Sequence, residues 1–117
     1  MTTNEIFRQL FGNSWPSDAE LVEYAVKRHG YGGDDGYYGV TYPTDLNEYE
    51  IVVERRCIKD GNVEIAYWDG DFQAIQITEA AYLEALEANL RSNENAALAN
   101  KVRSVITALR PNATSAE

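Results

Sequence analysis

Cys57 and His29 are the residues of this 117-residue chain that could form a nucleophile and its base, and each is the single residue of its type. A thiol needs a neighbouring imidazole to become a thiolate at neutral pH. However, Cys57 follows two arginines near the end of a predicted strand, and His29 falls in the last turn of a predicted helix, where a cation offsets the helix dipole. No Gly-x-Ser-x-Gly elbow is present for serine catalysis. We therefore expect no enzymatic activity and no catalytic residues.

The glycines at positions 30, 32, 33, 36 and 39 are typical of loops that cradle phosphate groups. No Lys-Ser or Lys-Thr pair follows them, however, and Asp34 and Asp35 would repel a phosphate. These two aspartates, with Asp69 and Asp71, could bind a hard cation, yet they lack the alternating oxygen ligands of a calcium loop. One cysteine and one histidine cannot build a structural zinc site. We expect no cofactor and no metal ion.

A more informative pattern is the mixture of aromatic and acidic residues around the glycine-rich segment and the second Asp-Gly turn. Tyrosine offers rigid contact area at a small entropy cost, and carboxylates pair with the Arg and Lys of a partner. The alternative is that these rings lie half buried on a sheet, where tyrosine is common, and we accept it for Tyr49 and Tyr67. The predicted partner-binding residues are Asp34, Asp35, Tyr37, Tyr38, Asp45, Trp68, Asp69 and Asp71.

The net charge of −9 at pH 7 is unevenly distributed. Residues 29–54 contain six acidic residues and no Lys or Arg, and residues 60–90 contain seven and again none. Such a field repels DNA, RNA and anionic lipid, and it attracts basic proteins. We therefore expect a basic protein partner, no direct nucleic-acid binding and no membrane binding.

The elements that must position these side chains centre on residues 48–77. Three β-type runs, at residues 49–58, 63–68 and 72–77, are joined by Asp60-Gly61 and Asp69-Gly70, which accept the positive φ of two-residue hairpin turns. Residues 37–42 form a fourth predicted strand. The glycine-rich residues 31–36 are predicted to be a loop.

Alternation along these strands predicts one apolar and one polar face. Ile51 and Val53 fall on the apolar face, with residues such as Ile65 and Ile77 from the later strands. Phe72 is out of phase with the later apolar residues of its strand, which indicates a β-bulge near Gln73 or Ala74.

Apolar periodicity and capping residues predict helices at residues 3–11, 18–29, 79–91 and 94–109, with Thr3, Ser17 and Thr78 as the first three N-caps. The order α-α-β-β-β-β-α-α predicts an α+β domain. In this fold a four-stranded antiparallel sheet, a meander, packs its apolar face on helices, chiefly the two C-terminal ones. Residues 1–111 should form one domain. Residues 112–117 have nothing to bury and should be disordered.

The start of the chain lacks the basic and then apolar pattern of a secretory signal, and no apolar run approaches the length of a membrane span. A lone cysteine fits a reducing compartment. These features predict a cytoplasmic protein.

The leading hypothesis is a non-enzymatic inhibitor whose acidic, tyrosine-rich surface blocks a basic partner, such as a nuclease toxin or another nucleic-acid-handling protein. In size, acidity and lack of a catalytic motif the chain resembles bacterial immunity proteins that neutralise a nuclease toxin, and also small phage inhibitors. No residue motif identifies either group, so no site is carried over from them. Two alternatives remain. One is a small ligand-binding or enzymatic α+β domain with a pocket between sheet and helices. The other is an oligomerising accessory subunit, in which the helix at residues 94–109 packs on its own copy.

Overall fold

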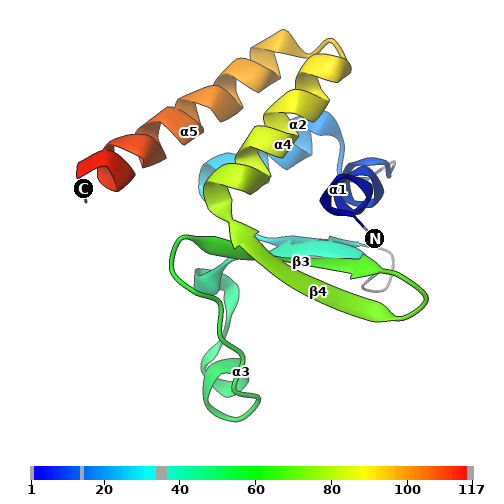
Figure 1. The fold of residues 1–117 in the computed structure, drawn as a ribbon, viewed down its shortest axis with the longest axis vertical. Coiled ribbons are helices and arrows are strands. Elements are labelled where there is room, and N and C mark those ends of the chain that lie inside the picture. Colours follow the sequence, from blue (N-terminus) through cyan, green and yellow to red (C-terminus); the bar gives the residue numbers. More distant parts are fainter. Residues whose placement is uncertain (1, 14, 34–36, 116–117) are drawn as a thin grey trace.

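The computed structural model describes residues 2–13, 15–33 and 37–115, and they build a four-stranded antiparallel sheet of order β1-β2-β3-β4. The strands are β1 (Tyr31–Gly33), β2 (Tyr38–Thr41), β3 (Asn62–Trp68) and β4 (Phe72–Thr78). Helices α1 (Thr3–Phe11), α2 (Asp18–Lys27), α4 (Glu79–Ser92) and α5 (Ala96–Ser115) lie on one side of the sheet (Figure 1). Between β2 and β3 lie the 3-10 helix η2 (Pro43–Asp45) and the short helix α3 (Glu48–Val52). The predicted α+β fold with its meander is confirmed, with α3 as an addition.

Side-chain caps define where the helices begin. The predicted N-cap of α2, Ser17, is present and forms a capping box with Glu20: the Ser17 hydroxyl accepts from the Glu20 amide at 3.3 Å, and the Glu20 carboxylate accepts from the Ser17 amide at 3.2 Å. Helix α4 starts at Glu79 with Thr78 as its N-cap, as predicted. Helix α1 is capped by Thr2 rather than Thr3. Helix α2 ends at Lys27, two residues before its predicted end, and its C-cap Arg28 has a φ of 55°.

The predicted strand at residues 49–58 is wrong. Asn47 caps a helix there, because its side chain accepts from the Glu50 amide at 2.8 Å while the Glu50 carboxylate accepts from the Asn47 amide at 3.1 Å. This local pair of hydrogen bonds outweighs the β-propensity of the apolar residues that follow. As a result, Asp60-Gly61 does not join two strands, although Gly61 has the positive φ of 85° that a turn favours.

The glycine-rich segment that was expected to be a loop supplies the missing strand. Tyr31 pairs with Val40, and Gly32 pairs with Gly39, so β1 is a short antiparallel edge strand. An ideal Cβ on Gly39 would lie 2.7 Å from the Tyr31 carbonyl oxygen, which shows how closely the two backbones approach. Residues 34–36, which follow β1, lie outside the described part of the chain.

The core forms between the sheet and two layers of helices. Val40 pairs with Ile65, and Ile65 pairs with Ile75, so these three residues share the face that packs on helices. Helices α1 and α4 make the main contacts with the strands, whereas α5 packs on α4 and α2. The prediction that the two C-terminal helices cover the sheet is therefore wrong for α5. Buried residues from all four helices include Leu10, Leu21, Leu86 and Ile106.

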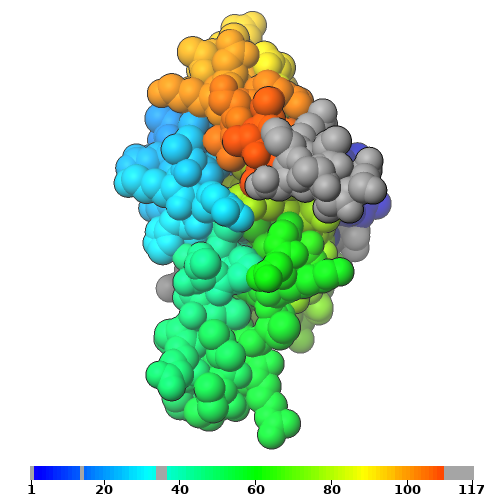
Figure 2. Space-filling view, turned by 90° about the vertical axis from the view of Figure 1, so that its left-hand side faces the viewer, coloured from blue at the N-terminus to red at the C-terminus, as the bar shows by residue number. Residues whose placement is uncertain are grey.

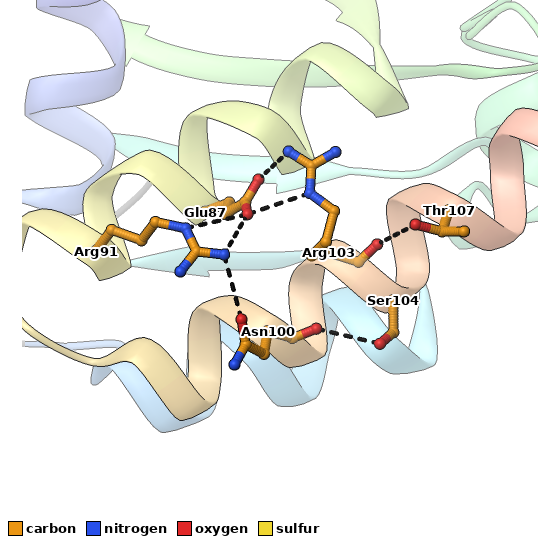
Figure 3. A network of polar contacts seen from close by, with 6 residues as sticks. All are labelled: Glu87, Arg91, Asn100, Arg103, Ser104 and Thr107. Atoms are coloured by element: carbon orange, nitrogen blue, oxygen red, sulfur yellow. Dashed lines mark hydrogen bonds and ion pairs between the residues drawn. The ribbon is translucent and has the colours of Figure 1, made fainter.

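Helices α4 and α5 are joined by a polar network as well as by apolar packing (Figure 3). The buried carboxylate of Glu87 accepts from Arg91 of its own helix at 2.7 Å and from Arg103 of α5. Arg91 also donates to the Asn100 side chain at 3.2 Å. Helix α5 continues past Pro111, beyond its predicted end, and disorder of residues 112–117 stays a prediction.

Candidate functional site

The β3–β4 hairpin carries an exposed group of aromatic rings. Trp68 and Phe72 are Cα partners next to the turn, so both side chains project from the sheet face opposite the core. Tyr37, which precedes β2, completes the group: its ring centroid lies 4.8 Å from that of Trp68 and 5.4 Å from that of Phe72. The Trp68 and Phe72 rings meet edge to face at 5.0 Å. Such contacts are favourable geometries for aromatic pairs, so the rings hold one another in place.

These rings remain accessible despite their mutual contacts. Phe72 is 56% exposed and Tyr37 is 38% exposed, while Trp68 is half buried. The hairpin is also fixed to helix α1, because the Gln9 side chain donates to the Trp68 carbonyl at 2.9 Å and accepts from the Trp68 amide at 2.7 Å. The result is an apolar surface on a rigid support, which reduces the entropy cost of binding.

Two of the predicted acidic residues frame the rings. Asp69 and Asp71 flank Gly70, whose φ of 77° is typical of a hairpin turn. The Asp69 amide donates to the Asp71 carbonyl at 3.0 Å, and the Asp71 carboxylate accepts from the Phe72 amide at 2.8 Å. Both aspartates are exposed. We call the set Tyr37, Trp68, Asp69, Asp71 and Phe72 the hairpin surface.

Phe72 was not among the predicted binding residues, and the predicted β-bulge next to it is wrong. The β3–β4 register runs without interruption from Asn62↔Thr78 to Trp68↔Phe72. Phe72 is out of phase with Ile75 because it faces the other side of the sheet. The sequence signal was present, since Phe72 lies an even number of positions from the polar Gln76 and an odd number from Ile75 and Ile77.

Other predicted binding residues lie elsewhere. Tyr38 is buried, and its hydroxyl donates to the Trp15 carbonyl at 2.6 Å, so it belongs to the core. Asp45 organises the chain after β2: one carboxylate oxygen accepts from the amides of Gly30 and Tyr42, both at 2.8 Å. Asp34 and Asp35 lie outside the described residues.

Part of the negative charge is neutralised within the chain. Buried Glu79 accepts from the guanidinium of Arg28 at 2.7 and 2.9 Å, and this carboxylate raises the pKa of Arg28. Arg56 pairs with Glu50 at 2.6 Å and with Glu64 at 2.9 Å. The folded protein is therefore less uniformly negative over these segments than its sequence.

A second exposed apolar surface lies on the segment that connects β2 to β3. Residues 46–57, which we call the arm, contain α3 and project from the rest of the molecule (Figure 2). Four of its apolar side chains are 50–65% exposed, and they are Tyr49, Ile51, Val52 and Val53. The expected burial of Ile51 and Val53 on the sheet is thus wrong.

An open cavity of about 760 Å³ lies beside the end of α2, strands β1 and β2, and the start of the arm. His29 and Asp45 line it, and the imidazole Nδ1 lies 2.7 Å from the Asp45 carboxylate. This contact fixes the orientation of the imidazole ring at the wall of the cavity. Cys57 is exposed and is not part of the cavity lining, so the arrangement offers no cysteine nucleophile.

The described residues contain no group of three or more His, Cys, Asp or Glu side chains that could hold a metal ion. Among the helices of the described ranges, none is both long and apolar enough to cross a bilayer. No known protein family matches the chain, and no curated protein or solved structure is significantly similar to it. The function is therefore argued from the geometry of the chain itself.

Proposed function

We propose that this protein binds a basic protein through the hairpin surface and blocks that partner's own ligand site. The observation that carries the proposal is an exposed cluster of three aromatic rings beside two exposed carboxylates on a hairpin anchored to α1. Rigid aromatic rings are favoured as binding hot spots, and carboxylates at the rim attract and orient a cationic partner.

A nucleic-acid-handling protein fits this description of the partner, because its phosphate-binding groove is cationic. The chain carries a net charge of −9, which favours association with such a groove and disfavours contact with nucleic acid itself. An immunity-like or inhibitor role in the cytoplasm is the form of this proposal that the sequence favours.

The first test is capture of partners from an extract of the native host, with identification by mass spectrometry. Wild-type protein is compared with the double variant Asp69→Lys, Asp71→Lys and with a matched control, Asp60→Lys, Glu94→Lys, which changes the net charge equally at exposed positions away from the hairpin surface. We expect a basic protein that binds the wild type and the control but not the hairpin variant. A captured set without a basic protein contradicts the proposal.

The second test uses that purified partner and measures binding kinetics. Reversal of charge at Asp69 and Asp71 should slow association and weaken its salt dependence. Trp68→Ala should raise the dissociation rate by at least about tenfold with little change in folding, because the ring projects from the face opposite the core. Unchanged association and dissociation rates in both variants would show that the hairpin surface does not bind the partner.

A second candidate function is ligand binding in the cavity that His29 and Asp45 line. Native mass spectrometry of protein purified from its host would show a bound small molecule, and His29→Ala should release it. The third alternative, self-association through α5, has less support, because Ala99, Val102 and Ile106 of this helix are already fully buried within one chain.

A further inference from the structure

Strand β4 leaves one edge of the sheet open. In the sheet order β1-β2-β3-β4 it pairs with β3 on one side, and no strand of the described residues pairs with the other. With seven residues, this edge is more than twice as long as the opposite edge strand β1, which has three residues, two of them glycine. An open edge of this length is a template for an added strand.

The register shows which backbone groups point outward. The Glu79 amide donates to the Gly61 carbonyl at 2.8 Å, and the Asp69 amide donates to the Asp71 carbonyl at 3.0 Å. These bonds fix the hydrogen-bonded pairs of the ladder at the odd-numbered residues of β4, because such pairs alternate along antiparallel strands. The amides and carbonyls of Ala74 and Gln76 therefore point to the open edge.

This edge lacks three of the usual protections against an added strand, namely charged residues, proline and a β-bulge. Residues Phe72–Thr78 contain no charged residue and no proline, and their uninterrupted pairing with β3 leaves no bulge. Ala74 and Gln76 are also exposed. The Gln76 side chain donates to the Cys57 carbonyl at 2.8 Å and accepts from the Lys59 amide at 3.2 Å, and these contacts involve its side chain rather than its main-chain groups.

Charge selects the occupant of this edge. A second copy is disfavoured, because each molecule carries a net charge of −9. A basic strand is attracted instead, because the carboxylates of Asp69 and Asp71 lie where β4 begins.

We propose that β4 is the docking edge for an extended, basic segment of the partner, which adds as a fifth antiparallel strand. The end of that segment would place Arg or Lys beside Asp69 and Asp71, next to the rings of the hairpin surface. This inference rests on the proposed function, since it gives the structural mode of the same interaction.

The probe for the test is a nine-residue peptide of alternating threonine and valine that ends in two arginines, added to the isotope-labelled full-length protein. Hydrogen exchange of the Ala74 and Gln76 amides, followed by NMR, should slow by about tenfold or more at saturation. Two further peptides carry N-methyl groups on alternate residues. The peptide whose methyl groups replace the amides that face β4 should lose binding, and the one methylated on the outward amides should keep it. Equal affinity of these two peptides would overturn the proposal.

Ala74→Pro tests the protein side, because the Ala74 amide points away from β3 and its loss leaves the ladder intact. Affinity for the peptide should fall by about tenfold or more, while the control Ala74→Val should bind within about twofold of the wild type. Circular dichroism checks the folding of both variants. If the proline variant does not fold, the methylated peptides decide the question.

Failure of this inference differs from failure of the proposed function. If the captured partner needs Asp71 and Trp68 but binds Ala74→Pro as well as wild type, strand addition is excluded and the hairpin surface stands. If the free protein is a dimer that Ala74→Pro dissociates, a second copy occupies the edge and the inference is overturned.

Discussion

Tyr38 and Tyr42 are both buried in the core between the sheet and the helices, but their hydroxyl groups differ. The Tyr38 hydroxyl donates to the Trp15 carbonyl at 2.6 Å, whereas the Tyr42 hydroxyl has no hydrogen-bond partner among the described residues. Burial raises the pKa of Tyr42 well above that of an exposed phenol. A buried polar group without a partner costs stability, so the two residues should respond in opposite ways to loss of the hydroxyl.

Tyr42→Phe should leave the free energy of unfolding unchanged or raise it by up to about 1 kcal/mol, because it removes an unpaired buried hydroxyl. Tyr38→Phe should lower it by about 1–2 kcal/mol, because the Trp15 carbonyl loses its donor. Urea unfolding followed by circular dichroism measures both values. A larger loss for Tyr42→Phe than for Tyr38→Phe would contradict the assignment.

Gly32 and Gly39 face each other across β1 and β2, yet a side chain would meet different surroundings at each. A Cβ at Gly39 would lie 2.7 Å from the Tyr31 carbonyl oxygen, while one at Gly32 would meet nothing within 4 Å. Gly39→Ala should therefore destabilise the protein by about 1–3 kcal/mol, and Gly32→Ala should change its stability by no more than about 0.5 kcal/mol. Thermal unfolding of the pair tests this, and equal effects would argue against the β1–β2 pairing.

At the scale of elements, the largest correction concerns residues 49–58. Their alternation of apolar and polar residues fits a strand, but the Asn47–Glu50 capping box starts a helix instead, and the arm leaves the sheet. Alternation describes which side chains could share a face; it does not say whether a neighbouring strand is there to pair with them.

The arm gives a direct test of this correction. Ile51→Ser and Val53→Ser should each change the free energy of unfolding by no more than about 0.5 kcal/mol, because both side chains are at least half exposed. Ile65→Ser is the matched control in the core and should cost about 3 kcal/mol or more. A strand in place of the arm would make all three substitutions costly.

The α4–α5 network should give stability a pH dependence. The hydrogen bond from Arg103, supported by Arg91, lowers the pKa of the Glu87 carboxyl below its usual range. The unfolded chain then binds a proton at higher pH than the folded protein does. The stabilisation from Glu87 is therefore complete above the ordinary glutamate pKa of about 4.3, and it disappears as the pH falls through the lowered folded value.

Glu87→Gln removes this titration, so its melting temperature should fall less than that of the wild type between pH 7 and pH 3. Glu23→Gln is the control, because Glu23 is 61% exposed and pairs within α2 with Lys27. Calorimetry at a series of pH values makes the comparison. Parallel profiles for wild type and Glu87→Gln would rule out a role for the network.

At the scale of the whole molecule, folding places two pairs of acidic residues in opposite environments. Glu79 and Glu87 become buried partners of arginines, while Asp69 and Asp71 stay exposed on the hairpin surface. The net charge of −9 therefore overstates how many carboxylates are available to a partner. Charge-reversal experiments are informative at the second pair and would mainly unfold the protein at the first.

The sequence by itself determined the fold class, the starts of α2 and α4, and the Asp69-Gly70 hairpin, because capping boxes, apolar periodicity and two-residue turns depend on neighbours along the chain. It also identified Trp68, Asp69 and Asp71 as candidates. Tertiary structure alone decided that glycine-rich residues 31–33 pair as a strand, that Tyr38 is core and that Phe72 joins the surface rings. The pairing of residues 31–33, the burial of Tyr38 and the contacts of Phe72 all depend on which distant segments of the chain lie next to them. Such pairing leaves no local signal in the residues that take part.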